Sequence, residues 1–184
     1  VSTAIEIYDE EDLTDFDIEF KLSRLEEAIN DADTSISSNE TTVVMRKDVN
    51  PDLNEDIYID INYRNAIVPG SLSTTKFISN NRTYQYTDLN ELNNTLTVSQ
   101  LAGGKYKITN SSTNIYLKDV TLTGYESYTV AGTIDYNNGI IALNKIQINA
   151  FVDSSSIKFY ATPQNQDITA TGNDLIQIDL ENLD

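Results

Sequence analysis

The hydrophobic positions between residues 14 and 36 recur at alternating intervals of four and three residues. This spacing places them on one stripe of a helix, close to the seam of a coiled coil. The stripe consists of Ile18, Leu22, Leu25, Ile29, Ala32 and Ile36. Thr14 and Asp17 resemble a capping box with Asp in place of Glu. The pattern predicts an amphipathic helix over residues 14–36, and we expect the polar residues 33–35 to weaken or end its last turn.

The apolar stripe has two interpretations. In the first, it covers a sheet of the same chain, as the apolar face of a surface helix usually does. In the second, it packs against a helix of another subunit, as a coiled-coil seam does. The second interpretation gives the candidate interface residues Ile18, Leu22, Leu25, Ile29 and Ile36. Before this helix, Ile5 and Ile7 alternate with polar residues, and an acidic run follows at residues 9–12. We expect that run to be a solvated linker or the approach to the helix.

After residue 36 the hydrophobic period changes from about 3.6 to 2, which indicates half-buried strands. The clearest alternation lies at residues 57–64, and an Asn-Gly step at Asn138 and Gly139 predicts a hairpin. We predict about ten short, mostly antiparallel strands, drawn from residues 41–49, 57–64, 75–78, 83–86, 96–98, 106–108, 115–117, 130–136, 140–143, 146–151, 157–161 and 175–180. Residues 88–94 could form a short helical turn. The expected fold class is therefore α+β with β dominant, in which one amphipathic N-terminal helix precedes the strands.

A turn-rich stretch at residues 66–73 suggests a boundary between two domains. The first, residues 1–70, would hold the acidic segment, the helix and the first strands, and the second, residues 71–184, would be β-rich. One domain over the whole chain is the alternative, since 184 residues suit either arrangement. The chain starts at Val1, and we expect it to be a fragment of a longer protein.

Charge excludes several classes of function. The chain has 29 acidic and 12 basic residues and a formal net charge of −17. Nucleic-acid binding needs a positive footprint, so we predict no nucleic-acid partner. An anionic membrane surface is disfavoured as well, and no apolar run is long enough to span a bilayer, so we predict no membrane partner. The sequence has no Cys and no His, which removes thiolate and imidazole chemistry.

Carboxylate chemistry has weak candidates. Asp60 and Asp135 lie within strand patterns and could serve as a glycosidase pair, but solvent-facing alternation is the favoured interpretation. Asp31, Asp33, Ser35 and Glu40 loosely resemble an acidic calcium loop, but this segment lacks the glycine that such a loop needs for its sharp turn. We therefore predict no catalysis, no cofactor, no metal and no small-molecule substrate.

Three stretches in order resemble one family. They are Ser-Ile-Ser-Ser-Asn-Glu-Thr-Thr-Val-Val-Met-Arg-Lys at residues 35–47, Gly-Thr-Ile-Asp-Tyr-Asn-Asn-Gly-Ile-Ile at residues 132–141, and Ala-Thr-Pro-Gln-Asn-Gln-Asp-Ile at residues 161–168 with Leu-Ile-Gln-Ile at residues 175–178. Together they resemble the C-terminal part of the large baseplate wedge protein of contractile-tailed phages of the T-even type, over about residues 30–180.

The resemblance implies a structural protein of the virion tail baseplate, assembled in the host bacterial cytoplasm. Its partners would be further copies of itself, in dimer or ring contacts, and other baseplate wedge proteins. It would join wedges into a ring around the central hub during assembly and tail contraction. The alternative from composition is a calcium-binding or adhesin-like β-sandwich module, because 20 Thr, 20 Asn and 15 Ser are typical of many-stranded, turn-rich domains.

Overall fold

The chain forms two compact units. The structure, a computed structural model, describes residues 1–13, 18–32, 41–89, 97–100, 106–109, 113–170 and 176–180. Unit 1 comprises residues 1–43 and 165–184, and unit 2 comprises residues 44–164. The boundary expected near residue 70 falls inside unit 2. The β-dominant α+β class is confirmed, because the described residues form two helices and fourteen strands in which every pair of strands is antiparallel.

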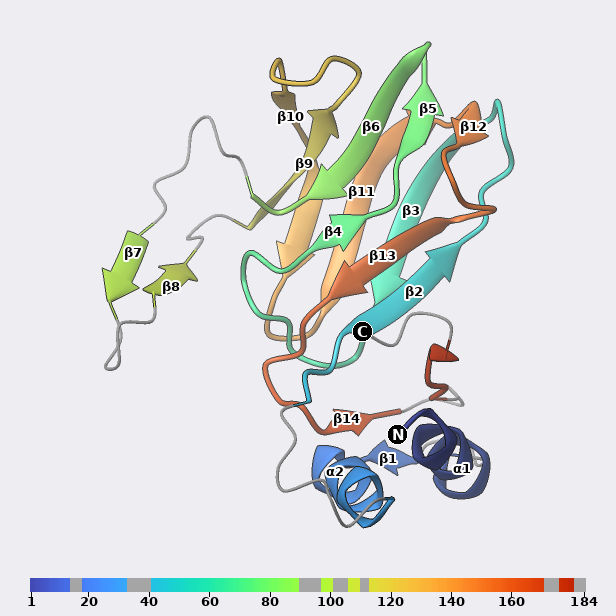
Figure 1. The fold of residues 1–184 in the computed structure, drawn as a ribbon. Coiled ribbons are helices and arrows are strands. Elements are labelled where there is room, and N and C mark those ends of the chain that lie inside the picture. The colour runs from blue at the N-terminus through green and yellow to red at the C-terminus, as the bar shows by residue number, and fades with distance from the viewer. Residues whose placement is uncertain are drawn as a thin grey trace. The chain divides into compact units, whose positions relative to one another are not determined.

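Unit 2 consists mainly of a ten-stranded sheet (Figure 1). Its strands are β2 (Met45–Val49), β3 (Asp56–Asn62), β4 (Ser73–Thr74), β5 (Phe77–Ser79), β6 (Arg82–Thr87), β9 (Asn114–Asp119), β10 (Ser127–Asp135), β11 (Ile140–Gln147), β12 (Ala150–Phe151) and β13 (Ile157–Ala161). The main path runs β2-β13-β4-β6-β9-β10-β11-β3, and β5 joins β6 to β12. The sheet curls into two layers, with β2, β13, β4 and β6 in front of β11 and β3 in Figure 1. A separate hairpin pairs β7 (Thr97–Gln100) with β8 (Tyr106–Thr109).

Most of the predicted strands are confirmed to within a few residues, because burial follows period 2. In β3 the side chains of Ile59 and Ile61 are buried, while Tyr58 and Asp60 are exposed. The Asn-Gly hairpin is confirmed too, and Gly139 there has φ +66°. An added Cβ at Gly139 would lie 2.2 Å from the carbonyl oxygen of Asn65, so the turn needs glycine for conformation and for space.

Aromatic rings fill the interior of unit 2. The rings of Phe77 and Tyr86 lie 5.2 Å apart, and Tyr86 stacks on Phe159 at 5.9 Å. All three side chains are almost completely buried. The hydroxyl of Tyr63 donates a 2.8 Å hydrogen bond to the carbonyl of Phe159, which satisfies a phenol in this apolar interior. Burial raises the pKa of Tyr63 and of Tyr86 far above the ordinary value of tyrosine.

A buried carboxylate, Asp88, holds the turn that leads into β4. It accepts hydrogen bonds from the main-chain N–H of Gly70 at 2.6 Å and of Leu72 at 3.2 Å, and from the hydroxyl of Tyr136 at 2.9 Å. Asp88 is completely inaccessible to solvent. Burial raises its pKa, against the lowering effect of these hydrogen bonds.

Unit 1 departs from the predicted single helix. Residues 18–31 divide into β1 (Glu19–Phe20) and α2 (Leu22–Asp31), and Ala32 is the C-cap of α2. The prediction of one helix over residues 14–36 is therefore wrong at residues 19 and 20, which pair with β14 (Ile168–Thr169). The proposed cap at Thr14 and the segment 33–36 lie outside the described residues.

Two further predictions for unit 1 are wrong. Residues 9–12, expected to be a solvated linker or the approach to a helix, are the last four residues of α1 (Ser2–Asp12). Ile5 and Tyr8, three residues apart, are buried on one face of that helix. Burial in this segment therefore follows the period of a helix and not the alternation inferred from Ile5 and Ile7. The strand expected at residues 175–180 is absent from its described part, 176–180, which is irregular with a single 3₁₀ residue at Leu180.

Replacement of Gly139 tests the hairpin. We expect Gly139→Ala to destabilise unit 2 at least twice as much as Gly124→Ala. Gly124 also has positive φ, but an added Cβ would meet nothing within 4 Å, so its cost is backbone strain alone, about 1 kcal/mol. Urea denaturation of the two variants checks this, and equal losses would contradict the close approach to Asn65.

The buried Asp88 predicts a pH dependence. Its folded pKa is raised, so the folded chain binds the proton more tightly than the unfolded chain does. The stability of the wild type should therefore fall, relative to Asp88→Asn, as pH rises from about 4 through the raised pKa. The measured quantity is the difference in unfolding free energy between the two proteins at each pH. The contributions of the other carboxyl groups to the pH dependence are common to both proteins and cancel in this difference. A difference that does not change with pH would contradict a raised pKa.

Candidate assembly site in unit 1

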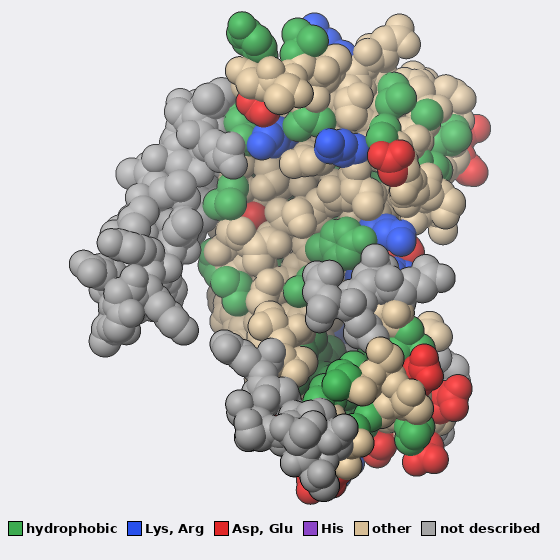
Figure 2. Space-filling view, viewed as in Figure 1, with side chains coloured by type: hydrophobic (Ala, Val, Ile, Leu, Met, Phe, Trp, Pro, Cys, Tyr) green, Lys and Arg blue, Asp and Glu red, His purple; other side chains and the backbone are tan. Residues whose placement is uncertain are grey.

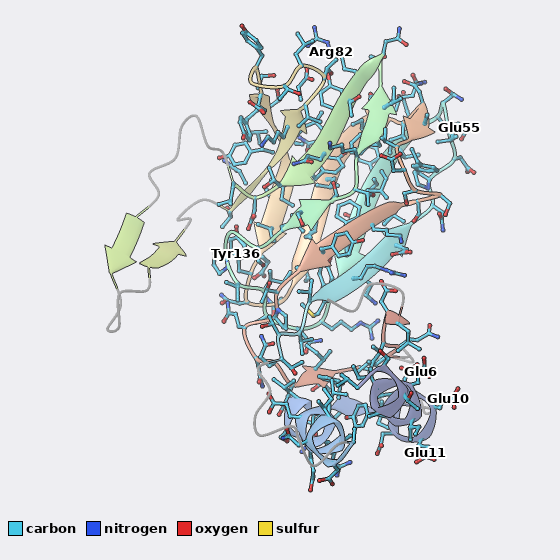
Figure 3. All side chains as sticks on the ribbon, viewed as in Figure 1. Glu6, Glu10, Glu11, Glu55, Arg82 and Tyr136 are labelled. Carbon is cyan, nitrogen blue, oxygen red and sulfur yellow. The ribbon has the colours of Figure 1, made fainter. Side chains whose placement is uncertain are left out.

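Helix α1 separates an apolar face from an acidic face. Ile5 and Tyr8 face inward, whereas Glu6, Glu10 and Glu11 are exposed. Figure 3 shows these three glutamates on the side of α1 that faces away from α2. The helix therefore buries its apolar stripe within unit 1 and presents carboxylates to its surroundings.

The predicted interface stripe lies largely inside unit 1. Leu25 and Ile29 are 6% and 5% exposed, in a cluster with Ile5, Tyr8, Leu13 and Phe20. Ile18 and Leu22 are partly buried and pack against that cluster. Ile36, the fifth predicted residue, lies outside the described residues. The structure thus brings four of the five residues to one cluster, and two of these retain accessible surface.

The C-terminal segment, residues 165–170 and 176–180, completes this cluster. β14 pairs with β1, with Phe20 opposite Ile168. Asp167 accepts a 3.0 Å hydrogen bond from the N–H of Leu22, the first residue of α2. A carboxylate at this position satisfies an otherwise unpaired N–H and interacts favourably with the helix dipole. Sequence reasoning missed this role because Asp167 is 145 residues away from Leu22.

Further hydrogen bonds hold the same segment. The N–H of Val43 donates to the side-chain oxygen of Gln166 at 2.7 Å. The N–H of Ile178 donates to Asp9 at 2.8 Å, which links the end of the chain to α1. Ile168, Ile176 and Ile178 add partly buried apolar surface to the cluster. The ends of the chain are therefore one folding unit.

Tyr8 lies where α1 meets the start of α2. Its ring packs edge-to-face on Phe20, with 6.1 Å between ring centroids. Its hydroxyl donates a 3.4 Å hydrogen bond to the carbonyl of Lys21. Burial raises the pKa of Tyr8, against the lowering effect of this hydrogen bond. Tyr8 therefore stays neutral and serves packing.

The charge of the chain is concentrated in unit 1. The residues of unit 1 include 18 acidic and 2 basic side chains, a net charge of −16. Those of unit 2 include 11 acidic and 10 basic side chains, a net charge of −1. On the face shown in Figure 2, most of the visible Lys and Arg side chains lie over unit 2. Unit 1 is therefore the part of the chain whose associations should respond to salt.

The residues considered for chemistry do not assemble into a reactive site. Asp60 and Asp135 are exposed, as solvent-facing alternation predicted. Hydrogen bonds from the Asn138 side chain and from the N–H groups of Asn138 and Asn137 lower the pKa of Asp135, whereas a glycosidase acid needs a raised one. Among the described residues, no three Asp, Glu, His or Cys side chains gather to hold a metal ion. Of the four residues of the supposed calcium loop, the described part of the chain includes Asp31 alone.

Burial predicts how the stripe residues contribute to stability. We expect Leu25→Ala to cost about 3 kcal/mol of unfolding free energy and Leu22→Ala about 1 kcal/mol, because a cavity forms at the fully buried site. Both described helices lie in unit 1, so ellipticity at 222 nm during urea denaturation follows this unit. The reverse order of the two losses would contradict the placement of Leu25 in the cluster.

Comparison with known proteins finds one family model that matches a segment lying mostly in unit 1. The model of a family described as baseplate structural protein gp6, C-terminal domain III, matches residues 1–48. The first stretch that carried the resemblance, residues 35–47, lies within this match, and the other two lie beyond it. No curated protein matches the chain as a relative. Within the described residues, no helix has the length and hydrophobicity to cross a bilayer. Residues 1–48, about a quarter of the chain, are thus similar to domain III of baseplate structural protein gp6, and this match supports the C-terminal portion of a phage baseplate wedge protein.

Proposed function

We propose that this protein joins baseplate wedges into a ring around the central hub of a contractile phage tail, during assembly and during contraction, without catalysis. The observation that carries the proposal is the match of residues 1–48 to domain III of baseplate structural protein gp6. Residues 1–43 of that match belong to unit 1, which is a folded body with its own apolar cluster.

The proposed partners are a second copy of the chain and other baseplate wedge proteins, met in the cytoplasm of the host bacterium. Closed rings need surfaces that recognise one another specifically. Leu25 and Ile29 are occupied by packing within unit 1. Ile18 and Leu22 keep accessible surface, so these two residues, together with Ile36, are the part of the stripe that would contact a second copy. Nucleic acid, membranes and small-molecule substrates have no place in this function.

Net charge influences these associations. Two copies, each carrying −17, repel one another, and salt screens that repulsion. Self-association should therefore strengthen as salt rises. Association of unit 1 with a basic surface of another wedge protein should weaken as salt rises, because screening reduces attraction. The sign of the salt dependence distinguishes the two kinds of contact.

Sedimentation velocity over a wide concentration range tests the role of the stripe in self-association. We expect Leu22→Glu to weaken dimer or ring formation at least tenfold, because it places a carboxylate in a half-buried apolar contact. Tyr125→Glu is the matched control, since Tyr125 is 81% exposed and lies in unit 2. The midpoint of thermal unfolding of Leu22→Glu, read at 222 nm, checks that unit 1 stays folded.

Three results would contradict the proposal. One is a wild-type chain that stays monomeric at every concentration and salt level. Another is an equal loss of association in Leu22→Glu and in Tyr125→Glu, which would move the contact away from the stripe. A third is self-association that weakens as salt rises from about 0.05 to about 0.5 M, opposite to the screening of like charge.

A further inference from the structure

The main sheet of unit 2 forks between β10 and β11. The two strands pair from Asp135 opposite Ile140 to Gly132 opposite Leu143, and their ladder ends there. Beyond that point residues 127–130 of β10 pair with β9, and residues 146–147 of β11 pair with β3. Each outer ladder has a register shift at this level, between Val130 and Gly132 and between Leu143 and Ile146. We call residues 127–131 and 144–147 the fork.

Close packing at Gly132 marks the point where the strands diverge. An added Cβ at Gly132 would lie 2.3 Å from the carbonyl oxygen of Ala142 and 2.9 Å from the Cα of Leu143. The last pair of the β10–β11 ladder therefore leaves no room for a side chain at Gly132, and no pairing of the two strands continues beyond it. Bulges redirect strands in this way and are frequent at the rims of barrels and beside binding sites.

A cavity of about 590 Å³ lies in the fork. Its walls are residues 129–131 of β10 and 144–147 of β11, and Tyr84, Tyr86 and Leu117 also line it. The volume falls within the usual range of ligand sites. The lining residues Asn80 and Asp56 lie close in sequence to Arg82 and Glu55, which Figure 3 labels toward one end of unit 2.

The lining is polar but carries no net charge. Lys145 and Asp56 form an ion pair with 2.6 Å between Nζ and Oδ2, so they neutralise each other. Thr129, Asn144 and Gln147 supply hydroxyl and amide groups, and Val130 and Ile146 supply apolar surface. Tyr86 is 1% exposed and lines the cavity, and within the described part of the chain its hydroxyl makes no hydrogen bond. A buried hydroxyl normally has a hydrogen-bond partner, and a molecule bound in the cavity could supply one to Tyr86.

We propose that the fork is a binding site for a short, extended, uncharged peptide segment of another protein. Main-chain N–H and C=O groups point alternately to the two sides of a strand, so some of those in residues 127–131 and 144–147 face the cavity. All of these residues are described, and no ladder joins β10 to β11 there. An inserted strand could pair with both edges, which is recognition by strand addition. This proposal goes beyond the structural role of unit 1 and does not depend on it.

Cysteine pairs test the fork itself. Thr133 and Ala142 are register partners, so Thr133→Cys with Ala142→Cys should oxidise to a disulfide. Ala131 and Asn144 would be the next outward partners if the ladder continued. Ala131→Cys with Asn144→Cys should stay reduced in the free protein under the same conditions. Efficient oxidation of the second pair would show closed strands and would overturn the proposal.

Binding is tested with the capped peptide acetyl-Thr-Val-Thr-Val-Thr-amide on the ¹⁵N-labelled full chain. Recognition through the main chain is tolerant of sequence, so this uncharged, β-branched peptide is a suitable probe. We expect its amide shift changes to cluster at residues 129–131 and 144–147. The same peptide with its amides N-methylated lacks main-chain donors and should bind at least tenfold more weakly.

A filling variant provides a second readout. Asn144→Trp should abolish the peptide-induced shifts by occupying the cavity, while Ala142→Trp, on the exposed face of the same strand before the fork, should leave them unchanged. The proposal is overturned if neither peptide shifts these residues at millimolar concentration, or if the N-methylated peptide binds equally well. It is also overturned if chitotriose shifts the fork residues and the peptide does not, since the site would then recognise saccharide.

Discussion

The pairing of β2 with β13 is the constraint on which the two-unit arrangement depends. In sequence, β2 is the first strand of unit 2 and β13 is the last. In the sheet the two are neighbours, and Met45 is the register partner of Ala161. Register partners in an antiparallel ladder lie about 5 Å apart. The chain therefore enters and leaves unit 2 at neighbouring points, although the unit comprises 121 residues. This closeness lets residues 165–170 return to residues 18–22 and complete the apolar cluster of unit 1.

Sequence patterns predicted unit 2 far better than unit 1. Alternation located β3 and β13 because each strand buries one face, and the Asn138-Gly139 step identified its hairpin because few other residues tolerate positive φ. In unit 1 the stripe through Leu25 and Ile29 correctly indicated a helix but extended across β1. A two-residue strand has no period, and its existence depends on Ile168 and Thr169, which no local pattern connects to it. The fork could not be predicted either, because register shifts are properties of pairing.

The two units divide the physical properties that an assembly component needs. Unit 1 carries nearly all of the net charge and most of the residues that match the baseplate family model. Unit 2 is nearly neutral and is held by an aromatic interior and the buried Asp88. A nearly neutral body repels its neighbours little, while an acidic body restricts which surfaces can approach. The nearly neutral unit 2 can thus pack closely against its neighbours, while the acidic unit 1 selects among partner surfaces by charge.

The insertion of unit 2 into the sequence of unit 1 favours an order of folding. Unit 2 is continuous in sequence and can form as soon as residues 44–164 are available. Unit 1 requires contacts between residues that are more than 140 positions apart, such as Leu22 and Asp167, and closing so long a loop in an unfolded chain is entropically costly and slow. Once β2 and β13 are paired, that loop is already closed. Helices α1 and α2 precede unit 2 in the chain, but their cluster also needs residues that follow unit 2, so a folded unit 2 favours its completion.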